Sequence, residues 1–365
     1  MRSEPLSLTL RTLHAELREL LLATGAGARL AAMPGSVVRK RIRGGVFVYY
    51  QYRDLGGRTR QLYLGPEREA RITALTERLA HAAEEEEDTA RIQELHAAYV
   101  AAGAPVLEHA PMRVLRAFAT AGVLRSEQGA AVLVGTHAFA AYAHLLGVRW
   151  AGSLGTQDMD LAAHRDAAAA RQTTGIEIAL RRPEASAPDA LAQLETGFLP
   201  VPALDPRTPS TSFKVRGQSM RVDLLATASD DEPGEPVFVP AFGGMAQPLP
   251  LLDYLLGETV AGLVVGRREL LVVALPAPER FALHKLVVAR SRPAAFATRA
   301  GKDRDQAAQV LAVLREEAPL GLRAALGALV QRGEPWFTRL REGVAVLAST
   351  APEEVAWVEE ELAKL

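Results

Sequence analysis

The spacing of apolar residues divides the chain into three parts, and the first part combines helices with a small sheet. Residues 1–32 carry leucines at helical spacing, and Pro34 and Gly35 end the predicted helix. Residues 37–42, 46–53 and 59–64 alternate apolar and polar side chains between glycine pairs, which predicts a three-stranded antiparallel meander. Residues 67–101 are again helical, and their acidic run at 84–88 is typical of a solvated helix face. We expect an N-terminal region, 1–108, that holds the meander at 37–65.

The middle of the chain mixes short apolar strands with helices. An amphipathic helix is predicted at 112–121, a buried strand at 130–134 and a helix at 138–146. Alternating runs at 212–226 and 262–275 predict further strands, and the Pro- and Gly-rich stretch 230–250 predicts a loop. From Pro278, which suits a first helical turn, the pattern is helical to the end. The chain is therefore expected to be α+β, with a central domain at 109–275 and a helical domain at 276–365.

Composition excludes several classes of protein. Hydrophobic residues make up 48% of the 365 and charged residues 23%, as in a soluble globular protein. The net charge of -1 gives no overall field toward nucleic acid or membrane, so any such attraction must be local. The absence of cysteine excludes disulfides, zinc-thiolate sites and thiol nucleophiles. The first residues lack a signal-peptide core, and the longest apolar run, 262–275, is broken by charges, so we expect a cytoplasmic protein without a membrane span.

Two aspartates in the middle third carry the strongest chemical signal. Asp158 and Asp160 are one residue apart, so on a strand their carboxylates share one face, about 7 Å apart along the chain. Carboxylates so placed can share Mg²⁺ or Mn²⁺ ions, which bridge a triphosphate and activate an attacking hydroxyl. Asp223, within the apolar strand 220–225, is the best candidate for a third ligand.

A second element lies just upstream of these acids. The strand 131–134 runs into Gly135 and Thr136 and then into a helix, an arrangement that offers N–H groups and a hydroxyl to a phosphate. Either element alone has a structural alternative, because acid pairs occur by chance and such a junction is often only a helix cap. Their order along the chain is more specific than either one.

In this order and spacing, the chain resembles the nucleotidyltransferase superfamily of DNA polymerase β type. Within it the chain is most similar to bacterial nucleotidyltransferase-fold proteins of uncertain substrate, and more distantly to nucleotidyltransferase toxins of abortive-infection systems. The resemblance covers roughly residues 110 to 310 and departs at Thr136, where the family commonly has Ser or Gly. It implies a mixed sheet in which Asp158 and Asp160 bind two metal ions, and Asp223 binds the catalytic one and helps to deprotonate the acceptor.

The implied activity is Mg²⁺-dependent transfer of a nucleoside monophosphate from an NTP to a hydroxyl of RNA, protein or a small molecule. The alternatives are a non-catalytic nucleic-acid-binding or regulatory protein with a degenerate transferase fold, and a toxin of a two-gene defence system. The sequence contains no Ser-His-Asp set, dinucleotide-binding fingerprint or Walker A loop, so those enzyme classes are not favoured.

Residues downstream add candidates to the site. By the same resemblance Lys285 approaches the triphosphate, with a solvated helix lysine as the alternative. Lys302 and Asp305 lie in a stretch expected to open the next helix, where they have either a nucleotide role or an ion-pair role. His137 is expected to face solvent rather than the phosphates, and His284 to pack or lie on the surface.

The meander has a local excess of positive charge. Basic side chains alternate there with aromatic ones, and Asp54 is the one acid. Because basic groups track a phosphate backbone and exposed rings stack on bases, the pattern favours contact with RNA or DNA. The expected contacts are Arg39, Lys40, Arg41, Arg43, Tyr50 and Tyr52. The alternative is an ordinary sheet whose rings cover one side.

Overall fold

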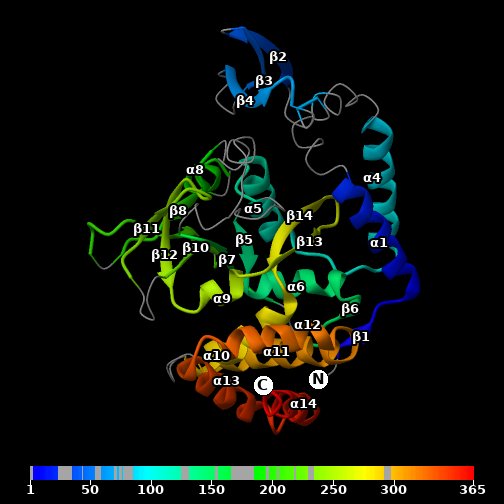
Figure 1. Cartoon of the computed structure of the whole chain (residues 1–365), viewed down its shortest axis with the longest axis vertical. Coiled ribbons are helices and arrows are strands. Elements are labelled where there is room, and N and C mark those ends of the chain that lie inside the picture. Colours follow the sequence, from blue (N-terminus) through cyan, green and yellow to red (C-terminus); the bar gives the residue numbers. More distant parts are fainter. Residues whose placement is uncertain are drawn as a thin grey trace.

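The structure of the chain is a computed structural model, and its α-helices and β-strands carry the labels of Figure 1. The structure describes residues 3–23, 35–42, 44–53, 59–69, 72–73, 76, 85–124, 131–152, 155–165, 185–194, 197–203, 205–217, 219–228, 234–291 and 297–365. Parts of the predicted helices at 1–32 and 67–101 lie outside these ranges. The helix termini and strands given below are those of the described residues.

A mixed sheet, nine-stranded within the described residues, occupies the middle of the molecule. Its main path runs β11-β12-β10-β7-β5-β14-β13, and β8 and β9 extend it beside β10. Strand β7 is parallel to β10 and antiparallel to β5, which confirms the expected mixed α+β class. The strands are β5 (Val132–Val134), β7 (Asp158–Ala163), β8 (Phe198–Pro200), β9 (Ser212–Val215), β10 (Arg221–Thr227), β11 (Val237–Val239), β12 (Gly244–Leu249), β13 (Thr259–Val265) and β14 (Leu270–Pro276).

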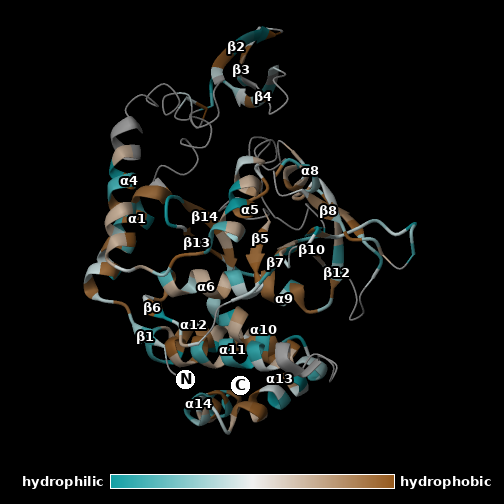
Figure 2. Cartoon of the chain, turned by 180° about the vertical axis from the view of Figure 1, so that it is seen from behind, coloured by the Kyte–Doolittle hydropathy of each residue, from teal (hydrophilic) through white to brown (hydrophobic). Residues whose placement is uncertain are grey.

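Helices cover both faces of this sheet (Figures 1 and 2). On one side lie α5 (His109–Thr120) and α8 (Ala187–Ala192), and on the other α6 (Gly135–Leu145) and α9 (Leu252–Leu256). The second layer continues into α10 (Pro278–Ser291), α11 (Ala297–Glu317), α12 (Pro319–Val330), α13 (Glu334–Leu347) and α14 (Pro352–Leu362). One hydrophobic core joins the sheet to these C-terminal helices, from Met112 to Val358. The expected domain boundary near 275 therefore crosses a continuous core, and it stays a prediction.

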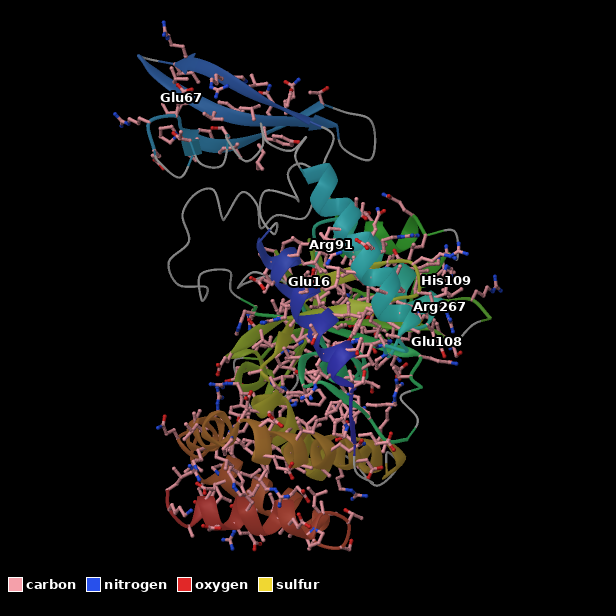
Figure 3. All side chains as sticks on the ribbon, turned by 90° about the vertical axis from the view of Figure 1, so that its right-hand side faces the viewer. Glu16, Glu67, Arg91, Glu108, His109 and Arg267 are labelled. Atoms are coloured by element: carbon pink, nitrogen blue, oxygen red, sulfur yellow. The ribbon has the colours of Figure 1, made fainter. Side chains whose placement is uncertain are left out.

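The N-terminal helices close one edge of the sheet. Helices α1 (Leu8–Ala23) and α4 (Glu85–Ala101) pack on each other and on β13 through a second apolar cluster that includes Leu17, Tyr99 and Leu263. Figure 3 shows Glu16 and Arg91 on these two helices, and their carboxylate and guanidinium lie 2.7 Å apart. The short strand β1 (Glu4–Pro5) pairs with β6 (Val148–Arg149). Within the described parts of the chain, no helix combines the length and apolar character needed to cross a bilayer.

The predicted meander is confirmed as a separate antiparallel sheet. It consists of β2 (Gly35–Ile42), β3 (Gly45–Arg53) and β4 (Thr59–Pro66), in that order. Figure 1 shows it apart from the larger sheet, beyond α1 and α4.

Two predictions of secondary structure are wrong. The stretch 230–250 contains β11 and β12 rather than only loop, because Val239 and Ala246 are fully buried in the core. Pro248 is tolerated in β12 because pairing with β11 ends at Ala246, so its missing N–H breaks no bond on that side. Helix α11 begins at Ala297, so Lys302 lies inside the helix and does not open it.

Buried histidines join α1 and α4 to α6. The Tyr99 hydroxyl lies 2.9 Å from His144 Nδ1, and the His14 and His144 rings stack with centroids 6.2 Å apart. Burial lowers the pKa of His14 to about 4 and that of His144 to about 3, aided by repulsion from Arg18 and from His14 respectively. Both imidazoles are therefore neutral in the folded protein near pH 7.

We predict that this cluster makes the fold acid-sensitive. Each histidine binds a proton near pH 6.5 when unfolded but only at much lower pH when folded, so stability is lost as pH falls below 6.5. The free energy of unfolding measured with urea should be lower at pH 5 than at pH 7, by about 2 kcal/mol for each histidine. His14→Phe should reduce that difference, whereas His109→Gln, an exposed control, should not. An unchanged pH dependence in the His14 variant would contradict this explanation.

Candidate active site

The predicted site residues surround one cavity of about 520 Å³ on the α6 and α10 side of the sheet. All three predicted carboxylates, Asp158, Asp160 and Asp223, line it. The other polar lining residues include Gly135, Thr136, Thr156, Lys285, Lys302 and Asp303. Leucines from β10, β12 and α9 and the ring of Phe281 supply an apolar wall. The cavity thus combines acids, a helix N-terminus, lysines and an apolar surface.

Strand register places the carboxylates side by side. In the parallel pair β7 and β10, Asp160 lies opposite Asp223 and Asp158 lies opposite Arg221. On its other side, Asp160 lies opposite Val134, the last residue before the turn into α6. Between the acids, Met159 and Val222 are fully buried, so the alternation of each strand turns its acids toward the cavity.

Gly135 brings the start of α6 against Asp160. Its φ of +66° is in the left-handed region, which a side chain disfavours. A Cβ atom at this position would lie 2.5 Å from Asp160 Oδ2. Glycine is therefore favoured here for two reasons: the backbone is left-handed, and the Asp160 carboxylate occupies the space of a side chain. The predicted importance of this turn thus has a physical basis in the structure.

Positive charges accompany the three acids. Arg221 Nε donates to Asp223 Oδ1 at 2.8 Å, and the Ser212 hydroxyl donates to the same oxygen. The Arg221 guanidinium also donates from Nη2 to Ser212 Oγ at 2.9 Å. Asp223 is thus held by a small polar network between β9 and β10.

Two lysines face the cavity from α10 and α11. Lys285 Nζ lies 2.5 Å from Asp303 Oδ1, and both side chains are largely buried, at 11% and 6% exposure. Lys302 Nζ donates to the Gly155 carbonyl at 3.1 Å. Burial lowers the pKa of Lys302, as does repulsion from Lys285, while the charges of Asp303, Asp158 and Asp160 act in the opposite direction. Lys302 and the acid pair thus line the same cavity.

The donor set can be tested against a divalent cation. Three aspartates on adjacent strands supply the hard oxygen ligands that Mg²⁺ and Mn²⁺ prefer. Within the described residues, however, no three acidic or histidine side chains converge as a formed metal site. Asp223 Oδ1 also accepts hydrogen bonds from Arg221 and Ser212. The ligand chemistry therefore fits such an ion, and Asp223 has competing partners.

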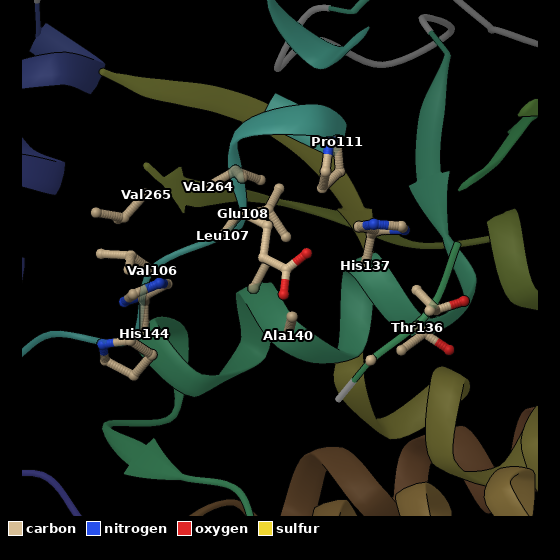
Figure 4. Close-up of a pocket in the computed structure, with 14 residues that line it drawn as sticks. Val106, Leu107, Glu108, Pro111, Thr136, His137, Ala140, His144, Val264 and Val265 are labelled. Atoms are coloured by element: carbon tan, nitrogen blue, oxygen red, sulfur yellow. The ribbon is translucent and has the colours of Figure 1, made fainter. Parts of the chain in front are cut away.

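A second cavity of about 270 Å³ shares Thr136 and Thr156 with the first. It follows one face of α6, where His137, Ala140 and His144 line it (Figure 4). Its opposite wall comes from residues 105–108, including Glu108, and from the end of β13. The two cavities are thus separated only by the start of α6 and the segment that leads into β7.

The expectation that His137 faces solvent is wrong. His137 is only 3% exposed, because residues 105–108 and β13 cover this side of α6. Burial lowers the pKa of His137 to about 4, helped by repulsion from Lys302 and opposed by a hydrogen bond to the Asp158 backbone. The ring is thus neutral near pH 7 and helps to hold the start of β7.

The sequence did not predict the contacts that some residues make in the site. Arg221 lies two residues before Asp223, so the sequence predicts that both side chains share one face of the strand. It does not predict the ion pair between them. Ser212 reaches Asp223 only through the pairing of β9 with β10. Gln306, whose amide donates to Thr136 Oγ1 at 3.3 Å, lies 170 residues away in sequence and gave no signal.

Comparison with known proteins agrees with this geometry. The profile of a family described as Nucleotidyltransferase matches residues 109–331, which is more than half of the chain. The match spans every residue described above as lining the larger cavity. The chain therefore belongs to this nucleotidyltransferase family and is a transferase of nucleotidyl groups. Neither the curated proteins nor the solved structures contain a match to it.

We predict that Gly135→Ala destabilises the protein more than a matched glycine change. Gly197 has nearly the same φ, +64°, but a Cβ there would meet nothing within 4 Å. Gly197→Ala should therefore show only the backbone cost of about 1 to 2 kcal/mol. Gly135→Ala should lose more unfolding free energy than that, because the new methyl group must also displace the Asp160 carboxylate. Equal losses of unfolding free energy in urea would show that Asp160 does not press against the turn.

Proposed function

We propose that this member of the nucleotidyltransferase family transfers a nucleoside monophosphate from an NTP to a hydroxyl group, in a reaction that requires Mg²⁺ or Mn²⁺. The acceptor oxygen attacks the α-phosphorus, its proton passes to a base, and pyrophosphate leaves with the electrons of the broken P–O bond. One observation carries the proposal: three carboxylates from two paired strands share a cavity with a helix N-terminus and two lysines. The arrangement supports a site of the DNA polymerase β type.

The three aspartates would hold the divalent cations. Asp158 and Asp160 project from one face of β7, and Asp223 lies beside Asp160 on β10. When bound there, such an ion neutralises phosphate charge and makes the acceptor hydroxyl more acidic. Asp223 would accept the proton of that hydroxyl after exchanging its bond with Arg221.

The start of α6 and the lysines would hold the triphosphate. Gly135 and Thr136 present N–H groups at the beginning of an 11-residue helix, where an anion is stabilised. Lys285 and Lys302 line the same cavity and can neutralise the phosphates from the opposite side. The Thr136 hydroxyl is oriented by Gln306.

The acceptor would approach from the smaller cavity. Thr136 and Thr156 line both cavities, so an acceptor held in the smaller one would be separate from the proposed NTP site and would reach the acids past these two residues. The acceptor class is a hydroxyl of RNA, of protein or of a small molecule. We also propose a local contact with nucleic acid through the basic meander.

A non-catalytic protein is the second candidate function. Arg221 and Ser212 already bind Asp223 Oδ1, which would exclude a metal ion if this pairing persisted with nucleotide present. Such a protein would bind NTP or nucleic acid without transferring anything.

We predict that labelled nucleotide is transferred only when the acid pair is intact. Wild-type protein with α-³²P-labelled NTPs, Mg²⁺ and total RNA or cell lysate should yield a labelled product. Asp158→Ala/Asp160→Ala should reduce labelling by at least about 100-fold, because the sites of charge stabilisation are lost. Asp205→Asn, which alters an exposed acid outside the cavity, should label as wild type does. Equal labelling by the wild type and the double variant would refute the proposal.

We predict separable roles for Lys285 in folding and in nucleotide binding. Lys285→Met should destabilise the protein by about 3 to 5 kcal/mol, because Asp303 is left as a buried charge. Adding Asp303→Asn should recover most of that stability. If Lys285 contacts phosphate, the stable double variant should still bind a fluorescent ATP analogue at least about tenfold more weakly. Wild-type affinity in that double variant would show that Lys285 is only structural.

A further inference from the structure

The meander has one covered face and one face that carries aromatic rings. The side chains of Val48, Tyr50 and Leu64 point to one side, and they are at most 3% exposed. Ile72, which follows the last strand, is also fully buried. The expectation that Tyr50 stacks on bases is therefore wrong, because its ring is only 3% exposed. Arg43 and the side chain of Tyr52 lie outside the described residues.

The opposite face carries three rings in contact. Strand register places Tyr49 opposite Tyr63, and Phe47 shares their side of the sheet. The Tyr49 and Tyr63 centroids are 5.3 Å apart, and those of Phe47 and Tyr63 are 6.2 Å apart. Tyr63 is 41% exposed. We call these three residues the aromatic face.

Polar groups suited to nucleotides surround the aromatic face. Lys40 Nζ lies 4.7 Å from the centroid of the Tyr49 ring and also donates to Gln61 Oε1. Gln61 Nε2 in turn donates to Gln51 Oε1 at 2.7 Å. Two amides and one ammonium group therefore lie next to the rings. Such groups can bond base edges, ribose hydroxyls and a phosphate.

The excess of positive charge in the meander favours a polyanion as the partner. Residues 36–64 contain seven basic side chains and one acid, Asp54, although the whole chain has a net charge of -1. Of the described basic groups, Arg39 is paired with Glu67 at 2.6 Å, so it is partly neutralised. A duplex would offer phosphates to this charge but would keep its bases stacked internally, which would leave the rings unused.

We propose that the aromatic face binds single-stranded RNA, with bases stacked on Phe47, Tyr49 and Tyr63 and a phosphate beside Lys40. Stacking on a sheet surface needs unpaired bases, and the Gln51 and Gln61 amides can bond the 2′-hydroxyls that distinguish ribose. This binding does not depend on the acids of the active site. It rests on the proposed contact between the meander and nucleic acid, and it deepens that proposal by naming single-stranded RNA as the partner and the aromatic face as its site.

The test is fluorescence anisotropy of a labelled single-stranded RNA of about 12 nucleotides with the full chain. Tyr49→Ala/Tyr63→Ala should raise Kd by about tenfold or more, whereas Tyr63→Phe, which keeps the ring, should bind as wild type does. Lys40→Gln should make the negative slope of log K against log salt shallower by about 0.7, because one phosphate contact is lost. Phe337→Ala provides the matched control, since Phe337 also lies near a cation, Arg341, but on α13.

The same assay separates this proposal from the enzymatic one. Asp158→Ala/Asp160→Ala should bind the RNA like wild type, whatever its effect on nucleotide transfer. Wild-type affinity in Tyr49→Ala/Tyr63→Ala would overturn the aromatic face as the binding site. Equal or tighter binding of DNA of the same sequence would overturn the assignment to RNA, and tighter binding of a duplex would overturn stacking. Absence of RNA binding by the wild type would overturn the proposal outright.

Discussion

The packing of three carboxylates into one cleft is the constraint on which the rest of the site depends. Asp160 and Asp223 occupy neighbouring positions on parallel strands, about 4.8 Å apart along the hydrogen-bonding direction. Like charges this close, partly shielded from water, repel each other unless cations accompany them. The fold brings those cations from three places: Arg221 on β10, Lys285 on α10 and Lys302 on α11. The shared core of sheet and C-terminal helices is what keeps the last two in place.

The same constraint links the cleft to nucleotide chemistry. Acids and basic groups of the cleft form ion pairs with one another. A metal ion bound to the acids and phosphates bound to the lysines can replace these pairs with little change in net charge. Arg221 is the clearest case, because it binds Asp223, the carboxylate that we propose as a metal ligand and proton acceptor. Gly135 contributes by its missing side chain, which lets the start of α6, our proposed phosphate site, lie against Asp160. Family membership and geometry therefore agree on nucleotidyl transfer.

Local sequence patterns predicted the helices, the strands and the acidic residues of the site. They did not predict which distant segments pack over a given side chain. The spacing of Asp158 and Asp160 and the turn at Gly135 were sufficient to place both around one cavity, because each depends on a single strand or helix start. The position of Asp223 beside Asp160 depends on the pairing of β7 with β10, which are separated by more than fifty residues. His137 and Tyr50 were misjudged for one reason. Both side chains are buried in the folded chain, His137 beside residues 105–108 and β13, which the local sequence around each residue does not reveal.

The most direct measurement is a crystal structure of the full chain with Mn²⁺ and a non-hydrolysable NTP, using the anomalous signal of manganese to locate the metal. We predict manganese bound by carboxylate oxygens of Asp158, Asp160 and Asp223, with Arg221 released from Asp223 and the triphosphate at Gly135 and Thr136. A nucleotide bound elsewhere, or manganese absent while Arg221 keeps its bond to Asp223, would contradict it.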